Sequence, residues 1–303
     1  MILKGQNFRI LIFDATANKF KCIGMASNCV VTDNSNTNDV TNKDDVGLAS
    51  KPKVTSQNWQ VQVDSLDVSD TAAMLNAAKS FTPFTLLWDE TSTTDNQEAL
   101  GAAFARSGMA YLADATFNFN NREVANKNLQ FVGTGGLSTL SEAPAYAAIS
   151  AGSYTMGQNV RLFLGSDNTT TPSSVIGSAL NCSLHISVQL EVVTTKDTVG
   201  DYDVQSPVSY SYDISTSALM RGNDTITSAV GAQTIANLQT IKAAGNPVKW
   251  FIANVGGENN RTKISEICSG SCIIQTLTLN GPNRQKADYT AQMISYGPLT
   301  VAA

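Results

Sequence analysis

The sequence VTNKDDVG at residues 40–47 returns as VTTKDTVG at residues 193–200, an offset of 193 − 40 = 153 positions. GQNFR at 5–9 returns as GQNVR at 157–161, and further colinear matches run to Gly135 and Gly297. Because these matches keep their order, and their offsets change only between segments, the pattern predicts a tandem duplication. The expected domains are residues 1–145 and 146–303, and the small-residue stretch 138–156 is the expected linker.

Each half has the alternation of apolar and polar residues that is typical of half-buried strands. Trp59, Val61 and Val63 alternate with polar neighbours, and the same parity returns over residues 208–214. Further strands are expected near 9–13, 111–119 and 129–132, and near 161–164, 273–279 and 291–294. The turn residues at 120–121 and 280–283 predict that the last strands of each half form hairpins.

One short helix is expected in the middle of each half. The first runs from Thr71 to Ser80 with Asp70 as its N-cap, and the second from Thr234 to Ala244, ended by Gly245. A second helix, from Gln97 to Arg106, is expected in the first half alone. The predicted fold class is therefore mainly β: two tandem β-sandwich or barrel domains, each with one short flanking helix and a long hairpin arm.

Long polar arms separate two expected strands in each half, at residues 32–53 and 193–207. Loops of this length are uncommon unless they are functional or disordered. Two interpretations are open: a solvated loop, or a hairpin arm that orders against a neighbouring subunit, which the matching positions favour. The candidate contact residues are Asn36, Asn42, Lys43, Asp44, Lys51, Lys196, Asp197 and Asp201.

Composition and charge exclude several classes of protein. The 303 residues are 42% hydrophobic and 15% charged, which argues against a disordered chain. The net charge of −5 argues against a sequence-reading nucleic-acid binder, which normally carries a basic excess. No apolar run reaches the roughly 18 residues of a membrane span, and Arg9 and Asp14 interrupt the N-terminal stretch too early for a signal peptide. We therefore expect a soluble protein that is made inside the cell.

Histidine and cysteine usage argues against a metal site. His185 is the one histidine, which excludes a multi-histidine metal centre. Cys182, His185, Cys268 and Cys272 could together supply four zinc ligands, but residues three apart on a strand point to opposite faces. The five scattered cysteines are instead expected to be buried thiols in a reducing compartment, and we expect no cofactor.

Other chemistry-bearing residues also favour structural roles. The glycine-rich residues 133–136 lack the following Lys-Ser/Thr of a phosphate loop. The carboxylates of Asp64, Asp67, Asp114 and Glu123 show no close pair of the kind a two-carboxylate hydrolase needs. The tryptophans are expected to be core residues; they are Trp59, Trp88 and Trp250.

Taken together, these residues resemble the major tail tube proteins of long-tailed bacteriophages. The likeness lies in the Ile-Gly before a Cys-ending strand, the Val-Thr-x-Lys-Asp arm, the aromatic-centred strand before the helix, and the hairpin that ends in Gly-Thr-Gly-Gly. It covers residues 23–66 and 111–137, and more faintly 176–219 and 273–299. The duplication departs from the common form, which has one such domain per chain.

The resemblance implies a structural, non-enzymatic virion protein, made in the host bacterial cytoplasm. Six such domains form a ring, so two domains per chain imply a homotrimer with pseudo-sixfold symmetry, and stacked rings form a hollow tail tube that conducts DNA from capsid to host. The implied partners are further copies, the tape-measure protein, the tail terminator and baseplate or tip proteins. A negative lumen would repel the passing phosphates.

Elementary physics agrees with this assignment. Exposed strand edges are a liability in a monomer, and joining them around a ring satisfies their hydrogen bonds. Removal of residues 34–51 is then expected to leave rings but no long tubes. The alternative is a two-domain β-sandwich binding module, at a cell surface or on a carbohydrate, because sandwiches support many functions.

Overall fold

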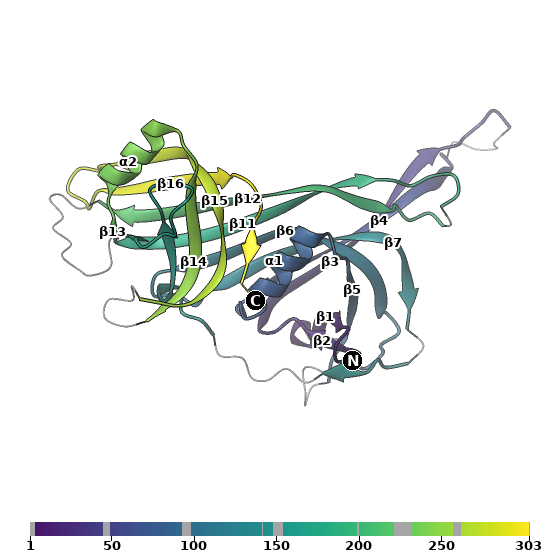
Figure 1. The fold of residues 1–303 in the computed structure, drawn as a ribbon. Helices are drawn as coiled ribbons and strands as arrows, with labels where there is room; N and C mark the ends of the chain where they lie inside the picture. Colours follow the sequence, from purple (N-terminus) through teal and green to yellow (C-terminus); the bar gives the residue numbers. More distant parts are fainter. Residues whose placement is uncertain are drawn as a thin grey trace.

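The computed structural model describes residues 4–44, 49–92, 98–140, 142–147, 154–198, 200–220, 232–256 and 262–302. Within these residues the chain forms many strands and two α-helices, so the predicted mainly β class is confirmed. The strands join into one large sheet that curves around an apolar core shared by both halves (Figure 1).

The first half of the chain supplies a sheet in the order β8-β2-β1-β5-β6-β7-β4-β3. Its neighbours are antiparallel except for β2 and β8. The elements are a 3₁₀ turn at Gly5–Asn7, β1 Phe8–Asp14, β2 Lys19–Cys22, β3 Ala26–Asp39, β4 Pro52–Ser65, α1 Thr71–Ser80, β5 Phe84–Glu90, β6 Arg106–Asn120, β7 Asn126–Thr139 and β8 Tyr146–Ala147.

The second half follows in the order β13-β10-β9-β14-β15-β16-β12-β11, and β17 pairs with the start of β15. Its elements are a 3₁₀ turn at Gly157–Asn159, β9 Val160–Leu164, β10 Val175–Ile176, β11 Ala179–Val192, β12 Gln205–Leu219, β13 Ala232–Gln233, α2 Ile235–Ala244, β14 Val248–Gly256, β15 Thr262–Asn280, β16 Asp288–Ser295 and β17 Thr300–Val301.

The two halves therefore follow one topology twice. Strands β1 to β7 correspond in order to β9, β10, β11, β12, β14, β15 and β16, with α1 matching α2. Even an irregularity recurs: the pairing of β3 with β4 shifts between Ala26 and Asn28, and that of β11 with β12 shifts between Ala179 and Asn181. Among the described residues, no pairing joins the outer strands, so the sheet is open rather than closed.

The core of each half is organised around one large aromatic side chain at the same position. Trp59 of β4 is buried, and its indole Nε1 donates to the carbonyl of Gly135 over 3.1 Å. A Cβ on Gly133 would lie 2.1 Å from the Trp59 ring, so only glycine leaves room for it there. Tyr212 holds the corresponding place in β12. The prediction that Trp59, Trp88 and Trp250 are core residues is confirmed.

Both expected short helices are present, but their caps differ. Thr234 accepts a hydrogen bond from the Asn237 amide, and Gly245 ends α2 in the left-handed conformation. Asp70 stands at the N-cap of α1 without making a side-chain cap hydrogen bond, because its carboxylate binds Lys127 instead. Asp70 is thus the N-cap residue, as predicted, but it makes no capping hydrogen bond; the bounds of α1 are also as expected.

The helix expected from Gln97 to Arg106 is wrong. Gln97 lies outside the described residues, and residues 98–105 form no helix before β6 begins. The amides of Gly101 and Ala102 donate to the buried Asp89 carboxylate over 2.7 and 2.9 Å, and Gly101 has φ +65°. The Asp89 carboxylate thus accepts hydrogen bonds from two amides that would otherwise donate to carbonyls of the expected helix. This tertiary contact outweighs the local helix propensity.

The first polar arm is paired as a hairpin over much of its length, whereas most of the second is the loop that closes the β11–β12 hairpin. β3 continues to Asp39 and β4 starts at Pro52, while β11 continues to Val192 and β12 starts at Gln205. Figure 1 shows both hairpins reaching toward the same side of the molecule, away from α2. Residues 45–48 and 199, which belong to the repeated arm sequence, lie outside the described part of the chain.

Candidate functional site

The two half-sheets meet at a junction between β6 and β11. These strands pair antiparallel from Asn120 opposite Asn181 to Asp114 opposite Ser187. The first part of β6 pairs with β5 instead, from Arg106 to Ala110. β6 therefore changes partner along one edge, and its second part is available to extend the sheet into the other half.

Apolar residues fill the inner face of this junction. Ala115 and Phe117 of β6 and Leu184 and Ile186 of β11 are all buried, and they belong to one continuous core cluster. Leu184 lies opposite Phe117, and Ile186 lies opposite Ala115. Each half thus completes its core by joining its sheet edge to the other half.

An ion cluster lies on the other face of the junction. The His185 Nδ1 lies 2.7 Å from Asp213 Oδ1 on β12, and its Nε2 lies 2.6 Å from Asp114 Oδ2 on β6. The hydrogen bond to Asp213 and the contact with Asp114 raise the pKa of His185 to about 9, against the effect of burial. At neutral pH the imidazolium donates to both carboxylates and links three strands across the junction.

We expect this cluster to make stability depend on pH above neutrality. The folded pKa of His185 exceeds its unfolded value of about 6.5, so its contribution is complete below pH 6.5 and is lost as pH rises through about 9. The side chain is one-third exposed, so we expect about 1 kcal/mol after screening, or about 2–4 °C in Tm. Thermal melts of the native protein and His185→Gln between pH 6 and 10 measure this. Parallel pH profiles would contradict it.

The sequence analysis found no close carboxylate pair of the kind a hydrolase needs, and it did not predict that Asp114 has a histidine partner. His185 brings Asp114 and Asp213 to one cluster, although they are far apart in the chain. His185 lies directly opposite Asp213 in the β11–β12 hairpin, but alternation along a strand predicts the face of a residue and not its partner. The register between β11 and β6, which adds Asp114, has no signal in the sequence.

The two arms are built alike. The Val40 amide donates to the Lys51 carbonyl over 3.0 Å, and the Val193 amide donates to the Val204 carbonyl over 2.8 Å. In each arm a threonine hydroxyl, of Thr41 or Thr194, accepts from the returning strand over 2.9 Å. The arms therefore share a closing geometry at positions 153 residues apart.

The second arm docks onto the first half of the same chain. The Gln57 amide of β4 donates to the Asp201 carbonyl over 2.7 Å, and the Asp203 amide donates back to the Gln57 carbonyl over 2.8 Å. The Gly135 amide of β7 donates to the Asp203 carbonyl over 2.9 Å. The backbone at Asp201 therefore makes a contact within the chain across the junction.

The candidate arm residues are all exposed at their side chains. Asn36 lies on β3 and donates to the Ser56 hydroxyl over 2.9 Å. Asn42, Lys43, Asp44 and Lys51 lie in the part of the first arm beyond the paired strands, and Lys196, Asp197 and Asp201 lie in the turn of the second. Apart from Asn36, the structure thus groups them at two hairpin tips, and the contacts of all eight with another subunit stay a prediction.

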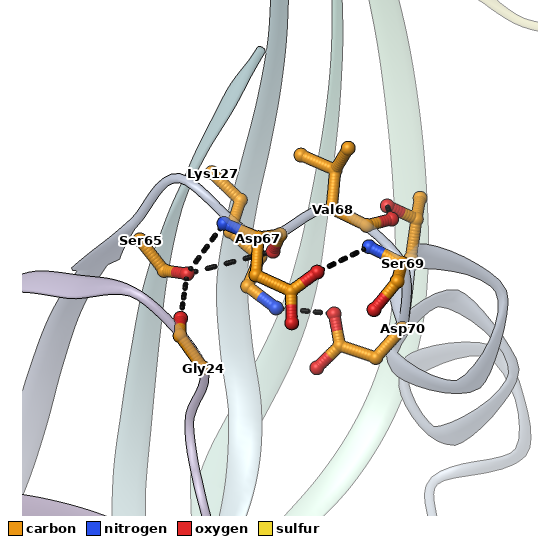
Figure 2. A network of polar contacts seen from close by, with 8 residues as sticks. Gly24, Ser65, Asp67, Val68, Ser69, Asp70 and Lys127 are labelled. Carbon is orange, nitrogen blue, oxygen red and sulfur yellow. Dashed lines mark hydrogen bonds and ion pairs between the residues drawn. The ribbon is translucent and has the colours of Figure 1, made fainter. Parts of the chain in front are cut away.

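Lys127 forms a second polar cluster, which the sequence analysis missed (Figure 2). This lysine is completely buried on β7, and its ammonium group pairs with the Asp70 carboxylate at the start of α1. Asp67 lies beside it: burial favours a raised pKa, but the Ser69 hydroxyl and amide and the Lys127 charge hold the Asp67 pKa below its usual value. The Ser65 hydroxyl ties the same turn to the Gly24 carbonyl. This cluster fixes α1 to the sheet.

The four residues considered as zinc ligands do not form one site, although Cys182 and Cys268 lie close enough to interact in the core. Cys182 is buried on the inner face of β11, whereas His185 binds its two aspartates on the other face. Burial raises the pKa of both Cys182 and Cys272 to about 12, which keeps these thiols protonated and unreactive. None of the five cysteines forms a disulfide. Within the described ranges, no group of three or more His, Cys, Asp or Glu side chains is placed to hold a metal ion.

Neither described helix has the length and apolar character needed to cross a membrane. The protein thus has two halves of the same strand topology, and β6 of the first half is joined edge to edge with β11 of the second.

Comparison with known proteins gives matches only in structure. No family model matches the sequence, and no curated protein matches it. The chain is similar to the tail of an empty gene transfer agent particle with C6 symmetry, at TM-score 0.38 and 16% identity over 49% of this chain and 99% of that one. It is also similar to the virion of a native gene transfer agent particle, at TM-score 0.36 and 16% identity over 49% and 99%. For the SPP1 tail tube the values are 0.35 and 12% over 48% and 79%. Each of these three likenesses covers about half of this chain.

Proposed function

We propose that this protein is a structural component of a phage tail that polymerises as stacked rings into the hollow tail tube. The observation that supports it is the internal junction, where β11 of one half extends the sheet of the other half at β6. β3 of the first half corresponds to β11, and the second part of β15 in the second half corresponds to that of β6. Neither of these two edges has a neighbouring strand among the described residues. The chain thus joins its two halves through one pair of edges and leaves the equivalent pair unpaired at its outer ends. Chains that join through these outer edges assemble into a closed ring or a fibre.

The stoichiometry follows from the duplication. We take residues 1–145 and 146–303 as two copies of one domain, because they share strand order and pairing irregularities. The first residues of the second copy, Tyr146–Ala147 of β8, still pair with β2 of the first. Three chains then supply six domains, and a homotrimeric ring has pseudo-sixfold symmetry. The arms would contact neighbouring subunits and rings, and the tape-measure protein, tail terminator and baseplate or tip proteins would bind inside the tube or at its ends.

The net charge of −5 suits a conduit for DNA, because a lumen of like sign keeps phosphates from binding to the wall. In this function the chain needs no catalytic residue and no cofactor. It would be made in the host bacterial cytoplasm and would act in the virion tail.

Assembly at high protein concentration tests the proposal. We expect electron microscopy and light scattering to show rings of three chains and tubes, and persistent monomers across salt and concentration would contradict it. Leu279→Lys places a charge on the open β15 edge, where Leu279 is 45% exposed, and should leave monomers. Ile264→Lys is the matched control, because Ile264 lies on the same strand, is 70% exposed and is far from that edge segment; it should assemble normally.

A further inference from the structure

We propose that two copies of this chain join by pairing β3 of one copy with β15 of the next, in the register of the internal junction. The inference rests on the proposed function, because it specifies the contact through which the rings would form. The partner is thus a second copy of this chain, and the evidence is the repetition of the internal junction at the two outer edges of the sheet.

The equivalence between β3 and β11 is fixed by their partners. Trp59 of β4 lies opposite Asp33, and Tyr212, which takes the place of Trp59 in β12, lies opposite Ile186. Asp33 and Ile186 are therefore equivalent positions, 186 − 33 = 153 residues apart. The shared pairing shift at Ala26 and Ala179 has the same spacing.

The equivalence between β6 and β15 is fixed by a second irregularity. The pairing of β6 with β7 shifts between Leu112 and Asp114, and the pairing of β15 with β16 shifts between Ile274 and Thr276. Asp114 and Thr276 are thus equivalent, 276 − 114 = 162 residues apart. In both strands the first part pairs with the preceding strand, β5 or β14. The second part of β6 then pairs with β11, whereas the same edge of β15 has no neighbouring strand among the described residues.

These two offsets convert the internal register into an intermolecular one. His185 opposite Thr116 becomes Thr32 opposite Thr278, and Leu184 opposite Phe117 becomes Val31 opposite Leu279. The full set of expected pairs is Val30 with Asn280, Val31 with Leu279, Thr32 with Thr278, Asp33 with Leu277 and Asn34 with Thr276.

Burial supports this pairing. Leu184 and Phe117 are buried in the internal junction, whereas Val31 is half-buried and Leu279 is 45% exposed. Likewise Cys182 is buried and its equivalent Cys29 is half-buried. The outer edges therefore leave open the apolar positions that the internal junction covers, as expected of surfaces that a second copy completes.

The two junctions differ in charge. The positions of His185, Asp114 and Asp213 correspond to Thr32, Thr276 and Gln60, so the outer junction is neutral where the inner one carries the ion cluster. If β11 paired with β15 of another copy, His185 would lie opposite Thr278, and Thr276 would stand in the place of Asp114. The cluster thus favours β6 as the partner of β11, and leaves β3 and β15 to each other.

Asp33 interrupts the row of apolar residues on the face of β3 that carries Val31. It stands where Ile186 lies in the inner junction, and its carboxylate hydrogen-bonds Tyr202 in the second arm of the same chain. The second arm, which docks across the inner junction, therefore supplies a hydrogen-bond partner for the Asp33 carboxylate at the outer edge.

Paired cysteines test the register. In a Cys29→Ser background, Thr32→Cys with Thr278→Cys should link copies under mild oxidation, because directly opposed residues have Cα atoms about 4.5–5.5 Å apart, within disulfide range. We expect most single chains to convert to linked species, in a ladder that ends at three chains. Thr32→Cys with Leu279→Cys should stay unlinked, because these side chains lie on opposite faces. Ser183→Cys with Asn118→Cys is the internal reference and should link within one chain.

The possible outcomes separate the register from the function. Rings that form without the 32–278 link, or that link through 32–279 or 32–276, would overturn this register while the proposed assembly stands. A protein that stays monomeric in every variant, while the internal reference links, would overturn both. A 32–278 link that joins this chain only to an unrelated protein would also reject the second copy as the partner.

Discussion

Replacing Lys127 with alanine is expected to lower the free energy of unfolding by about 3 kcal/mol, the largest effect of any single substitution considered for this chain. Lys127 has no exposed side-chain surface, and its ammonium group pairs with Asp70. Its removal would leave the Asp70 carboxylate without its cation, and a cavity beneath α1. Urea denaturation measures the loss, in a Leu279→Lys background so that assembly does not contribute to the measured stability.

A control and a rescue separate the ion pair from general damage. Lys263 pairs with Glu266 at the surface over 3.0 Å, and Lys263→Ala should cost less than about 1 kcal/mol. Lys127→Met combined with Asp70→Ala removes both charges and should recover most of the stability, because an apolar pair of similar volume can replace a buried ion pair. Tyr289, at the position of Lys127 in the second half, is a neutral buried residue. Equal losses for Lys127→Ala and Lys263→Ala would refute the role of the buried pair.

The repeat and the strands could be predicted because their signals are local. Alternation around Trp59 and around residues 208–214 reports which face of a strand is buried, whatever the strand pairs with. The Gly245 stop of α2 is local too, and it is observed. The mainly β fold and the two short helices follow from such signals.

The polar clusters could not be predicted because their members are distant in sequence. Lys127 and Asp70 are 57 residues apart, and only the packing of α1 on the sheet brings them together. Asp114 reaches His185 over 71 residues through the β6–β11 register. The missing helix has the same cause, since Asp89 captures the amides of Gly101 and Ala102 from a neighbouring segment. In each of these three examples, contacts between elements that are distant in sequence determine the observed structure.

The shape of the arms could be predicted from the sequence, but their contacts could not. Their sequence predicted matching polar hairpins, and both closures are alike. It did not predict that the second arm docks on Gln57 and Gly135 of its own chain, so that only the first arm has no described docking surface within the molecule. Figure 1 shows the first arm projecting beyond the rest of the fold. We therefore predict that the first arm, rather than the second, makes the contacts between stacked rings.

Trimming the first arm is expected to abolish long tubes and leave single rings. The variant replaces residues 39–52 with Asn-Gly, which closes the hairpin at the Asn38–Lys53 pair with a favoured two-residue turn. It keeps Val30 to Asn34, the edge expected to join neighbouring copies, so ring formation should persist. Lengths measured by electron microscopy should fall from many stacked rings to one.

A milder variant tests whether charge at the tip makes the contact. Lys43→Gln with Asp44→Asn keeps the length of the arm but removes two exposed opposite charges. If these charges bind the next ring, native tubes should shorten as salt rises, because exposed ion pairs are screened, and the neutral variant should give short tubes at every ionic strength. Long tubes from the trimmed arm would reject the bridging role. Long tubes from the neutral variant alone would instead locate the contact in the hairpin backbone, where the second arm makes its own contacts with Gln57.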